Sequence, residues 1–313
     1  MKRYHAARVP TMYFVGVTTQ QSSIMKIFPR WAQQLGLDAA RLIGIDLPLD
    51  ADPHRYREVV SFIKKDALSL GALVTTHKMN LLRAARREFD YLDPYACRFE
   101  EISVISKRNG QLEGYAKDPI SSGLAMEHFI PRDYWANYRG EVLLLGSGGS
   151  ALAISAYLSE NLRGNNMPER IILTNNRDGG LREAQEIISR IDTPVPFEFE
   201  LTETTEFSDA LIGRLKPHSL VVNATGMGKD RPGSPITDWA LFPQHGIAWE
   251  INYRGTLEFL HQARRQQKMR SLFVEDGWIY FIHGWAQAIA EVFHVVIGPN
   301  TLARLSAIAK DVS

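Results

Sequence analysis

Residues 142–153, "VLLLGSGGSALA", join an unbroken apolar run to a glycine-rich turn and then to small and apolar residues. A short apolar run that ends in glycines predicts a buried strand, and the run after the turn predicts a helix. The turn has the spacing Gly146-x-Gly148-x-x-Ala151. In the order strand, turn, helix, this spacing is typical of a loop that binds the pyrophosphate of a dinucleotide.

Each residue of the turn has a physical role in that interpretation. Gly146 permits a tight turn, and Gly148 and Gly149 let the backbone approach the pyrophosphate, while Ala151 lets the helix pack closely on the strand. Ser150 lies in the first turn of the helix, whose amides and positive dipole end favour an anion. The alternative is a glycine-rich turn without a ligand. A P-loop is excluded because no Lys-Ser/Thr pair closes the motif.

The next strand, "RIILT" at 170–174, ends in the polar segment "NNRDGG". In a dinucleotide-binding sheet this strand end meets the adenosine ribose. Asp178 suits the 2′-hydroxyl of NAD, whereas Arg177, with Asn176 beside it, suits the 2′-phosphate of NADP. We therefore expect NAD or NADP, with a slight preference for NAD because a carboxylate would repel a phosphate. Alternatively, these charges belong to a solvated loop.

On both sides of the glycine turn, strand-like and helix-like segments alternate, which predicts an α/β fold with mostly parallel sheets. Asn109-Gly110 predicts a two-residue hairpin between strands. The expected strands are 13–17, 41–48, 72–76, the two arms within 101–118, 142–145, 170–174, 219–223 and 247–251. The expected helices are 24–37, 54–70, 119–129, 179–191, 207–215 and 276–293.

The stretch "GALVTTHKMN", residues 71–80, places Lys78 where a buried strand ends and a helix begins. A cation at the positive end of the helix dipole costs a few tenths of a kcal/mol, roughly, so its position calls for a reason. The carboxyl ends of strands are where α/β sheets place ligands. Lys78 is therefore a candidate catalytic residue, and a solvated loop lysine is the alternative.

Composition narrows the class of protein. The chain has 313 residues, which predicts two domains or one large one, and its 45% apolar and 23% charged residues are ordinary for a globular protein. A formal net charge of +1 gives no reason to expect nucleic acid or an anionic membrane as a partner. The single cysteine, Cys97, excludes an internal disulfide and suits a reducing compartment. With neither a signal peptide nor a membrane span in the sequence, we expect a cytoplasmic location. The nine histidines form no metal-binding motif, so no metal is expected.

Further stretches of the sequence resemble the shikimate/quinate dehydrogenase family. That family has a strand-end "NVTxPHK", which supplies a catalytic lysine, and a "GxNTDxxG" segment, which supplies its aspartate partner. This chain has "LVTTHK" at 73–78 and "GYAKDPISSG" at 114–123. The resemblance implies that Lys78 and Asp118 are the catalytic pair. A helix N-cap is the alternative role for Asp118, since Pro119 follows it.

Segments expected to lie near the cofactor also resemble the shikimate/quinate dehydrogenase family. "VVNATGMG" at 221–228 is similar to the family's "NATxxGM" loop, and "EINY" at 250–253 to its "D-x-x-Y" strand. "EDGWIYFIHGWAQA" at 275–288 is similar to its "DGxxMLxxQA" helix. The resemblance covers nearly the whole chain and implies further cofactor-binding residues at Asn223, Ala224, Thr225 and Met227.

Departures from the family pattern lie where the substrate carboxylate binds. The family's "SxSPxxHN" loop appears as "TTQQSSIMKIF", where Ser22 stands for the first serine and Ile24 for the second. Ala116-Lys117 replaces the Asn-Thr of "NTD", and Gly284 falls at the family's substrate-contacting glutamine. These changes predict a substrate other than shikimate itself. The candidate substrate-binding residues are Ser22, Ser103, Tyr253, His283 and Gln287.

The resemblance implies a substrate-binding and catalytic domain of residues 1–120 with 276–313, whose last helices pack back on its first part. Residues 121–275 then form a Rossmann-type domain. The expected reaction interconverts a ring hydroxyl and a ketone on a small cyclic polyol or a shikimate/quinate-like acid. The alternatives are a folate-linked methylene dehydrogenase and a non-catalytic nucleotide-sensing protein. The expected partner is a small-molecule substrate, and a homodimer is one candidate assembly.

Overall fold

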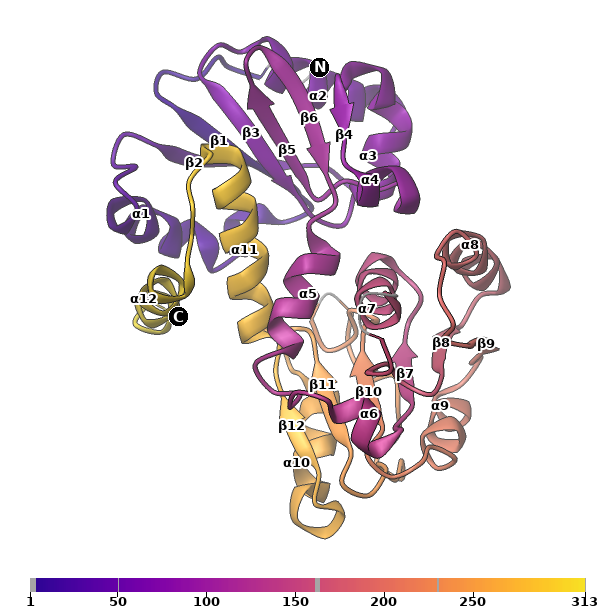
Figure 1. The fold of residues 1–313 in the computed structure, drawn as a ribbon. Coiled ribbons are helices and arrows are strands. Elements are labelled where there is room, and N and C mark those ends of the chain that lie inside the picture. The colour runs from indigo at the N-terminus through magenta and orange to yellow at the C-terminus, as the bar shows by residue number, and fades with distance from the viewer. Residues whose placement is uncertain (1–3, 50, 161–163, 230, 313) are drawn as a thin grey trace. The chain divides into compact units, whose positions relative to one another are not determined.

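The computed structural model describes residues 4–49, 51–160, 164–229 and 231–312. The chain forms two compact units (Figure 1). Unit 1 is Met1–Lys117 with Gly284–Ser313, and unit 2 is Asp118–His283. The domain borders expected from the sequence, after residues 120 and 275, stay a prediction.

Unit 1 contains a six-stranded mixed sheet in the order β2-β1-β3-β5-β6-β4. β1, β2 and β3 are parallel, β5 is antiparallel to both β3 and β6, and β4 is parallel to β6. Its strands are β1 (Thr11–Gly16), β2 (Arg41–Asp46), β3 (Ser69–Val74), β4 (Tyr91–Leu92), β5 (Val104–Arg108) and β6 (Gln111–Tyr115).

The β5–β6 hairpin confirms the expected two-residue turn. Arg108 pairs with Gln111, so only Asn109 and Gly110 form the loop. Both have positive φ angles, 52° and 79°. Asparagine and glycine tolerate this left-handed conformation, which matches the right-handed twist of the flanking strands.

The helices of unit 1 bury the apolar residues of its sheet. The cluster around Tyr56, Val59 and Ile63 of α2 packs with Val15 and Val74 of the central strands. The helices are α1 (Ile24–Gln34), α2 (Pro53–Lys65), α3 (Lys78–Ala85), α4 (Pro94–Phe99) and α12 (Pro299–Lys310), with the short turns η1 (Thr19–Gln21) and η2 (Arg86–Glu88). α12 packs on α1, where Trp31 Nε1 donates to the carbonyl oxygen of Leu305 at 2.8 Å. The last helix therefore packs back on the first part of the chain, as expected.

Unit 2 contains a six-stranded parallel sheet in the order β12-β11-β10-β7-β8-β9. This is the strand order of a Rossmann-type sheet, in which the first strand, β7, lies centrally and the chain winds outward on each side. Figure 1 shows β7 and β10 beside one another in this sheet. Its strands are β7 (Val142–Leu145), β8 (Ile171–Asn175), β9 (Phe197–Leu201), β10 (Leu220–Asn223), β11 (Ile247–Glu250) and β12 (Phe273–Glu275).

Helices cover the sheet of unit 2, and α5 packs on α7. Leu143, Val221 and Ala248 from three strands pack with Phe259 of α10 in one buried cluster. The helices are α5 (Asp118–Met126), α6 (Tyr134–Tyr138), α7 (Gly149–Ser159), α8 (Asp178–Ile188), α9 (Thr205–Ile212) and α10 (Glu258–Arg270). Helix α11 (Trp278–Phe293) begins in unit 2 and ends in unit 1. The α/β class and the Rossmann-type sheet predicted from the sequence are confirmed.

The described part of the chain contains neither a membrane-spanning helix nor a cluster of metal-binding side chains. Within residues 4–49, 51–160, 164–229 and 231–312, no helix is long and apolar enough to cross a membrane. Over the same ranges, no group of three histidine, cysteine, aspartate or glutamate side chains is arranged to hold a metal ion.

Candidate functional site

The glycine turn of unit 2 lies at the switch point of the sheet, where the strand order reverses between β7 and β10. Gly146 has φ 115°, and a Cβ placed on it would lie 2.7 Å from the carbonyl oxygen of Ala224, so no other residue fits there. A Cβ placed on Gly148 would meet nothing within 4 Å, so this side of the turn is open to a ligand. Gly149 begins α7, and Ala151 is fully buried against the sheet. The backbone amides of the turn, the open space beside Gly148 and the N-terminus of α7 therefore suit a pyrophosphate.

The end of β8 is tied to this turn by side chains. Asn175 Nδ2 donates to Ser147 Oγ at 2.8 Å, and Asn175 Oδ1 accepts from the Arg177 backbone N–H at 3.0 Å. Neither Ser147 nor Asn175 was predicted from the sequence, because the dinucleotide-binding fingerprint does not specify a residue type at either position. The result is a fixed path for residues 176–178 over the edge where the adenosine ribose belongs.

The three candidate ribose-binding residues are all exposed, and Asp178 has a partner. Asp178 begins α8, and Arg182 one turn later donates to its carboxylate at 2.6 Å. The side chains of this pair are 61% and 79% exposed, so the pair itself adds little stability. It does reduce the repulsion between Asp178 and a 2′-phosphate, which was the reason for preferring NAD.

The loop after β10 is held by its own side chains. Asn223 Oδ1 accepts from the backbone N–H and the hydroxyl of Thr225, at 3.2 and 2.7 Å. Thr225 Oγ1 accepts from the Met227 N–H at 3.1 Å, and the Met227 carbonyl accepts from Asn223 Nδ2 at 3.2 Å. The structure thus brings Asn223, Thr225 and Met227 together, with Ala224 facing the glycine turn.

Glu250, at the end of β11, lies beneath this loop and was missed by sequence reasoning. Its side chain is fully buried, and Asn223 Nδ2 donates to it at 2.7 Å. Burial raises the pKa of the Glu250 carboxyl to about 7, against hydrogen bonds from Asn252 and Asn223 and the charge of Lys229, which lower it. The "EINY" motif points to this strand end, but nothing local in the sequence marks the glutamate as buried.

In unit 1, four strand ends lie together at one end of the sheet. They are the carboxyl ends of β1, β3 and β6 and the amino end of the antiparallel β5. Four residues of interest follow or precede these strand ends: Ser22, Lys78, Ser103 and Lys117. Lys78 is the first residue of α3 and is half-buried. Its expected place, at a strand exit and in the first turn of a helix, is confirmed.

His77 fixes the backbone just before Lys78. It is buried, with Nδ1 3.1 Å from the hydroxyl of Tyr56 and Nε2 3.2 Å from the carbonyl oxygen of Leu47. Since the carbonyl can only accept, Nε2 carries a proton and donates to the Leu47 carbonyl. The start of α3 is thereby anchored to α2 and to the segment after β2.

A buried carboxyl group, that of Glu101, interacts electrostatically with Lys78. Glu101 is 3% exposed, and the next backbone N–H, of Ile102, points to the Lys78 carbonyl at 3.5 Å. Burial raises the pKa of the Glu101 carboxyl, while the positive charge of Lys78 opposes that shift. Sequence reasoning missed Glu101, because a glutamate beside another glutamate before a strand looks like a solvated charge.

Ser103 supports the backbone that leads to Asp118. Its Oγ accepts from the Lys117 N–H at 2.8 Å. The Lys117 ammonium pairs with Glu291 at 2.8 Å and lies 4.6 Å from the centre of the Tyr115 ring. Asp118 follows as the first residue of α5 and is half-buried.

The other candidate substrate-binding residues have varied surroundings. Ser22 is buried after η1, where its backbone N–H donates to the Thr19 carbonyl at 3.0 Å. The Tyr253 ring lies 4.3 Å from that of Phe281, centre to centre. His283 is 4% exposed, and its Nε2 lies 3.1 Å from Nε2 of His128. Burial, followed by the charge of His128, lowers the pKa of His283 to about 4.

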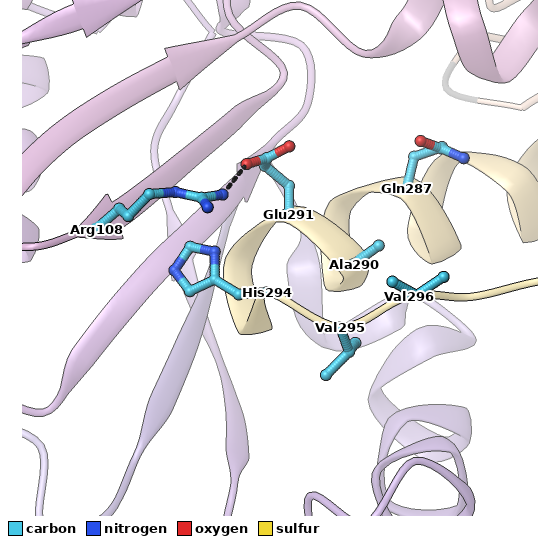
Figure 2. A pocket seen from close by; sticks show the side chains of 7 residues that line it. All are labelled: Arg108, Gln287, Ala290, Glu291, His294, Val295 and Val296. Carbon is cyan, nitrogen blue, oxygen red and sulfur yellow. Dashed lines mark hydrogen bonds and ion pairs between the residues drawn. The ribbon is translucent and has the colours of Figure 1, made fainter.

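Gln287 lies at a pocket of unit 1 with a volume of about 260 Å³ (Figure 2). In Figure 2 the pocket is bounded by the last turns of α11 and by Arg108 of β5, whose guanidinium pairs with Glu291 at 3.2 Å. Arg108 is at the hairpin end of β5, whereas Lys78 is at the other edge of the sheet. Glu291, which also lines this pocket, pairs with the Lys117 ammonium at 2.8 Å, and Lys117 follows β6 at the Lys78 end of the sheet.

Comparisons with known proteins agree in sequence and in fold. No protein-family model matches the chain. It is 27% identical over 263 residues to a shikimate dehydrogenase (NADP(+)) of Symbiobacterium thermophilum, covering 83% of this chain and 82% of that protein. It is 31% identical over 225 residues to a shikimate dehydrogenase (NADP(+)) of Methanothrix thermoacetophila, covering 69% of this chain and 72% of that protein.

A solved structure of quinate dehydrogenase from Corynebacterium glutamicum, in complex with NAD, has the same fold. It matches with a TM-score of 0.74 at 16% identity, over 97% of this chain and 99% of that one. At this identity the likeness establishes the fold alone. Together with the 31% identity above, it shows that the chain belongs to the shikimate dehydrogenase family and is an NAD(P)-dependent dehydrogenase of that type.

Proposed function

We propose that the protein interconverts a ring hydroxyl and a ketone on a small cyclic polyol or a shikimate/quinate-like acid. Lys78 carries the proposal, because it stands half-buried just after the carboxyl end of β3, one of three neighbouring parallel strands, where α/β proteins bind ligands. Relatives named shikimate dehydrogenase support the substrate class.

Alcohol oxidation removes a proton from oxygen and a hydride from carbon. We assign the proton to Lys78 Nζ and the role of orienting that amine to the Asp118 carboxylate. The bound oxidised nicotinamide supplies the hydride acceptor. In the reverse direction the Lys78 ammonium stabilises the developing alkoxide and returns the proton.

Glu101 has a supporting role in this proposal. Its buried carboxyl interacts electrostatically with Lys78 and is separated from bulk water, so this interaction is stronger than that of a surface carboxyl group. We propose that it positions the Lys78 side chain and sets its charge.

The substrate carboxylate of the family's acids has fewer evident partners here. Ile24 replaces the second serine of the loop, Ser103 is engaged with the Lys117 backbone, and Lys117 itself is paired with Glu291. We therefore propose a substrate whose anionic group, if it has one, is bound differently. Ser22 and Tyr253 remain proposed contacts, as do Ser103, His283 and Gln287.

The test is turnover of purified protein with NAD or NADP and a panel of cyclitols, shikimate and quinate. We expect at least one ring alcohol to reduce the cofactor, and Lys78→Ala to abolish that activity while cofactor binding persists. An unimpaired Lys78→Ala variant would refute the assignment. Folate-dependent reduction, or cofactor binding without any turnover, would instead favour the two alternatives, which the relatives do not support. Light scattering tests the proposed homodimer separately.

A further inference from the structure

Glu250 is a fully buried carboxyl group that the proposed chemistry does not use. It ends β11, beside the strand that leads into the loop of residues 224–228. Three N–H donors converge on it. Oε1 accepts from the backbone N–H of Asn252 at 2.9 Å and from its Nδ2 at 2.6 Å, and Oε2 accepts from Asn223 Nδ2 at 2.7 Å.

The same two amides also hold the loop. Asn223 Nδ2 donates to the Met227 carbonyl at 3.2 Å, and Asn252 Nδ2 donates to that oxygen at 3.3 Å. Each amide therefore bridges Glu250 and Met227 with its two N–H groups. Asn223 cannot reverse its amide, because its Oδ1 already accepts two hydrogen bonds from Thr225.

The loop that these bridges hold faces the glycine turn across the switch point. The Ala224 carbonyl would lie within 2.7 Å of a Cβ on Gly146. In a sheet of this order a dinucleotide crosses the switch point, with its adenosine over β8 and its nicotinamide on the β10 side. The position of Met227 thus sets one wall of the nicotinamide site.

We propose that Glu250 is a positioning residue for the cofactor, which holds Met227 and its loop in place through Asn223 and Asn252. This inference rests on the proposed function, because it needs a nicotinamide cofactor in unit 2. The carboxylate is required because both oxygens must accept hydrogen bonds. A glutamine would turn an NH₂ group toward one of the donors, and a protonated carboxyl would likewise replace an acceptor by a donor.

The second consequence is a pH dependence of cofactor binding. Burial raises the pKa of Glu250 to about 7, and Lys229 is the charged group that faces it. As the pH falls through 7, Glu250 takes up a proton, the bridges weaken, and cofactor affinity falls.

The experiment is fluorescence titration with NADH from pH 6 to pH 8.5. NADH is the probe because it lacks the 2′-phosphate, whose own second ionisation lies near pH 6 and would confuse the profile. We compare the wild type with Glu250→Gln and with Glu275→Gln as a matched control. Glu275 ends the adjacent strand β12 and is half-buried, and burial raises the pKa of its carboxyl too.

For Glu250→Gln we expect about tenfold weaker NADH binding at pH 8, the usual effect of losing a hydrogen bond to a charged group. We also expect its Kd to be independent of pH. The wild type and Glu275→Gln should bind more weakly as the pH falls from 8 to 6. A Glu250→Gln variant with the affinity and pH profile of the wild type would overturn the inference.

A second variant covers the case in which Glu250→Gln does not fold. Asn252→Ala removes one of the two bridges and keeps the carboxyl group, so it should weaken NADH binding and retain the pH dependence. Unchanged affinity in Asn252→Ala would overturn the inference. If the folded wild type binds neither NADH nor NADPH, the proposed function fails and the inference fails with it. Failure of the inference alone looks different, because the wild type then binds the cofactor and the Glu250 and Asn252 variants bind it equally well.

Discussion

Ser103 Oγ accepts a hydrogen bond from the backbone N–H of Lys117 at 2.8 Å. Ser103 precedes β5 and Lys117 follows β6, so this bond closes the hairpin at the edge of the sheet where Lys78 stands. Lys117 is covalently joined to Asp118, the proposed orienting carboxylate. The position of this proposed catalytic group therefore depends on a serine that need not touch the substrate.

Ser103→Ala is expected to lower both stability and turnover. It leaves the Lys117 N–H without this partner, which costs about 1 kcal/mol in the free energy of unfolding, and lets the backbone before Asp118 shift. Ser106→Ala is the control, since Ser106, three residues later in β5, is also buried but donates to the Glu291 carbonyl at 3.0 Å. Urea unfolding should show similar losses for the two variants, and only Ser103→Ala should lose turnover. Equal turnover in both would remove Ser103 from the account.

Arg177→Ala is expected to change the choice between the two cofactors. Arg177 is exposed directly after β8, and a charge-assisted bond to a 2′-phosphate is worth roughly a tenfold change in affinity. NADPH binding should weaken about tenfold and NADH binding should change little. The control Arg182→Ala removes the partner of Asp178, which should restore repulsion and disfavour NADPH more modestly. If Arg177→Ala affects both cofactors alike, the arginine does not read the phosphate.

The glycine turn and the strands on either side of it along the chain were predictable from the sequence because they depend on local patterns. Continuous apolar runs and glycine spacing identified β7, β8, β10 and β11 and the start of α7. The edge strands β9 and β12 were missed. β9 is only partly buried and β12 has three residues, so neither has the apolar run that marks a central strand. The helix expected at 54–70 ends at Lys65, and β3 begins at Ser69.

The places of candidate site residues were predictable from the sequence only where a motif contained them. Lys78 follows a strand and begins a helix, which is visible in the sequence. Glu101 and Glu250 were missed because a glutamate has no local signature of burial, and Lys78 beside Glu101 and Asn223 beside Glu250 lie on other elements of the chain. His283 is buried against His128, 155 positions away along the chain, a pairing that no spacing rule predicts.

His283 makes the stability of the protein depend on acid pH. Burial lowers its pKa to about 4 in the folded protein, against about 6.5 in an unfolded chain. Between these two values the unfolded state binds a proton and the folded state does not, so stability falls as the pH falls from 6.5 to 4. The loss amounts to about 3 kcal/mol at most. His128, which faces His283, opposes its protonation, and Glu127 favours it.

Urea unfolding of the wild type and His283→Gln at several pH values between 4 and 7.5 checks this effect. The variant has no imidazole at this position and should lose less stability on acidification. If the free energy of unfolding falls by the same amount with pH in both proteins, His283 does not contribute to the pH dependence of stability.

Glu101→Gln is expected to lower kcat with little effect on KM or on cofactor affinity. The substitution keeps the shape of the side chain and removes the buried carboxyl group that interacts with Lys78. We expect roughly a tenfold fall, corresponding to about 1.4 kcal/mol of transition-state stabilisation. Glu100→Gln, at the exposed neighbouring position, is the control and should keep wild-type turnover. A rise in KM alone, with kcat unchanged, would contradict a role through Lys78.

Lys78 is the centre of the account, and replacing it is the most direct test. Turnover of the best ring-alcohol substrate and the Kd for NADH are measured side by side for the wild type and Lys78→Ala. Loss of a general acid–base group predicts a fall in kcat of about 10²–10⁴-fold, while the Kd for NADH stays within about twofold. A folded Lys78→Ala enzyme with wild-type kcat would contradict the account.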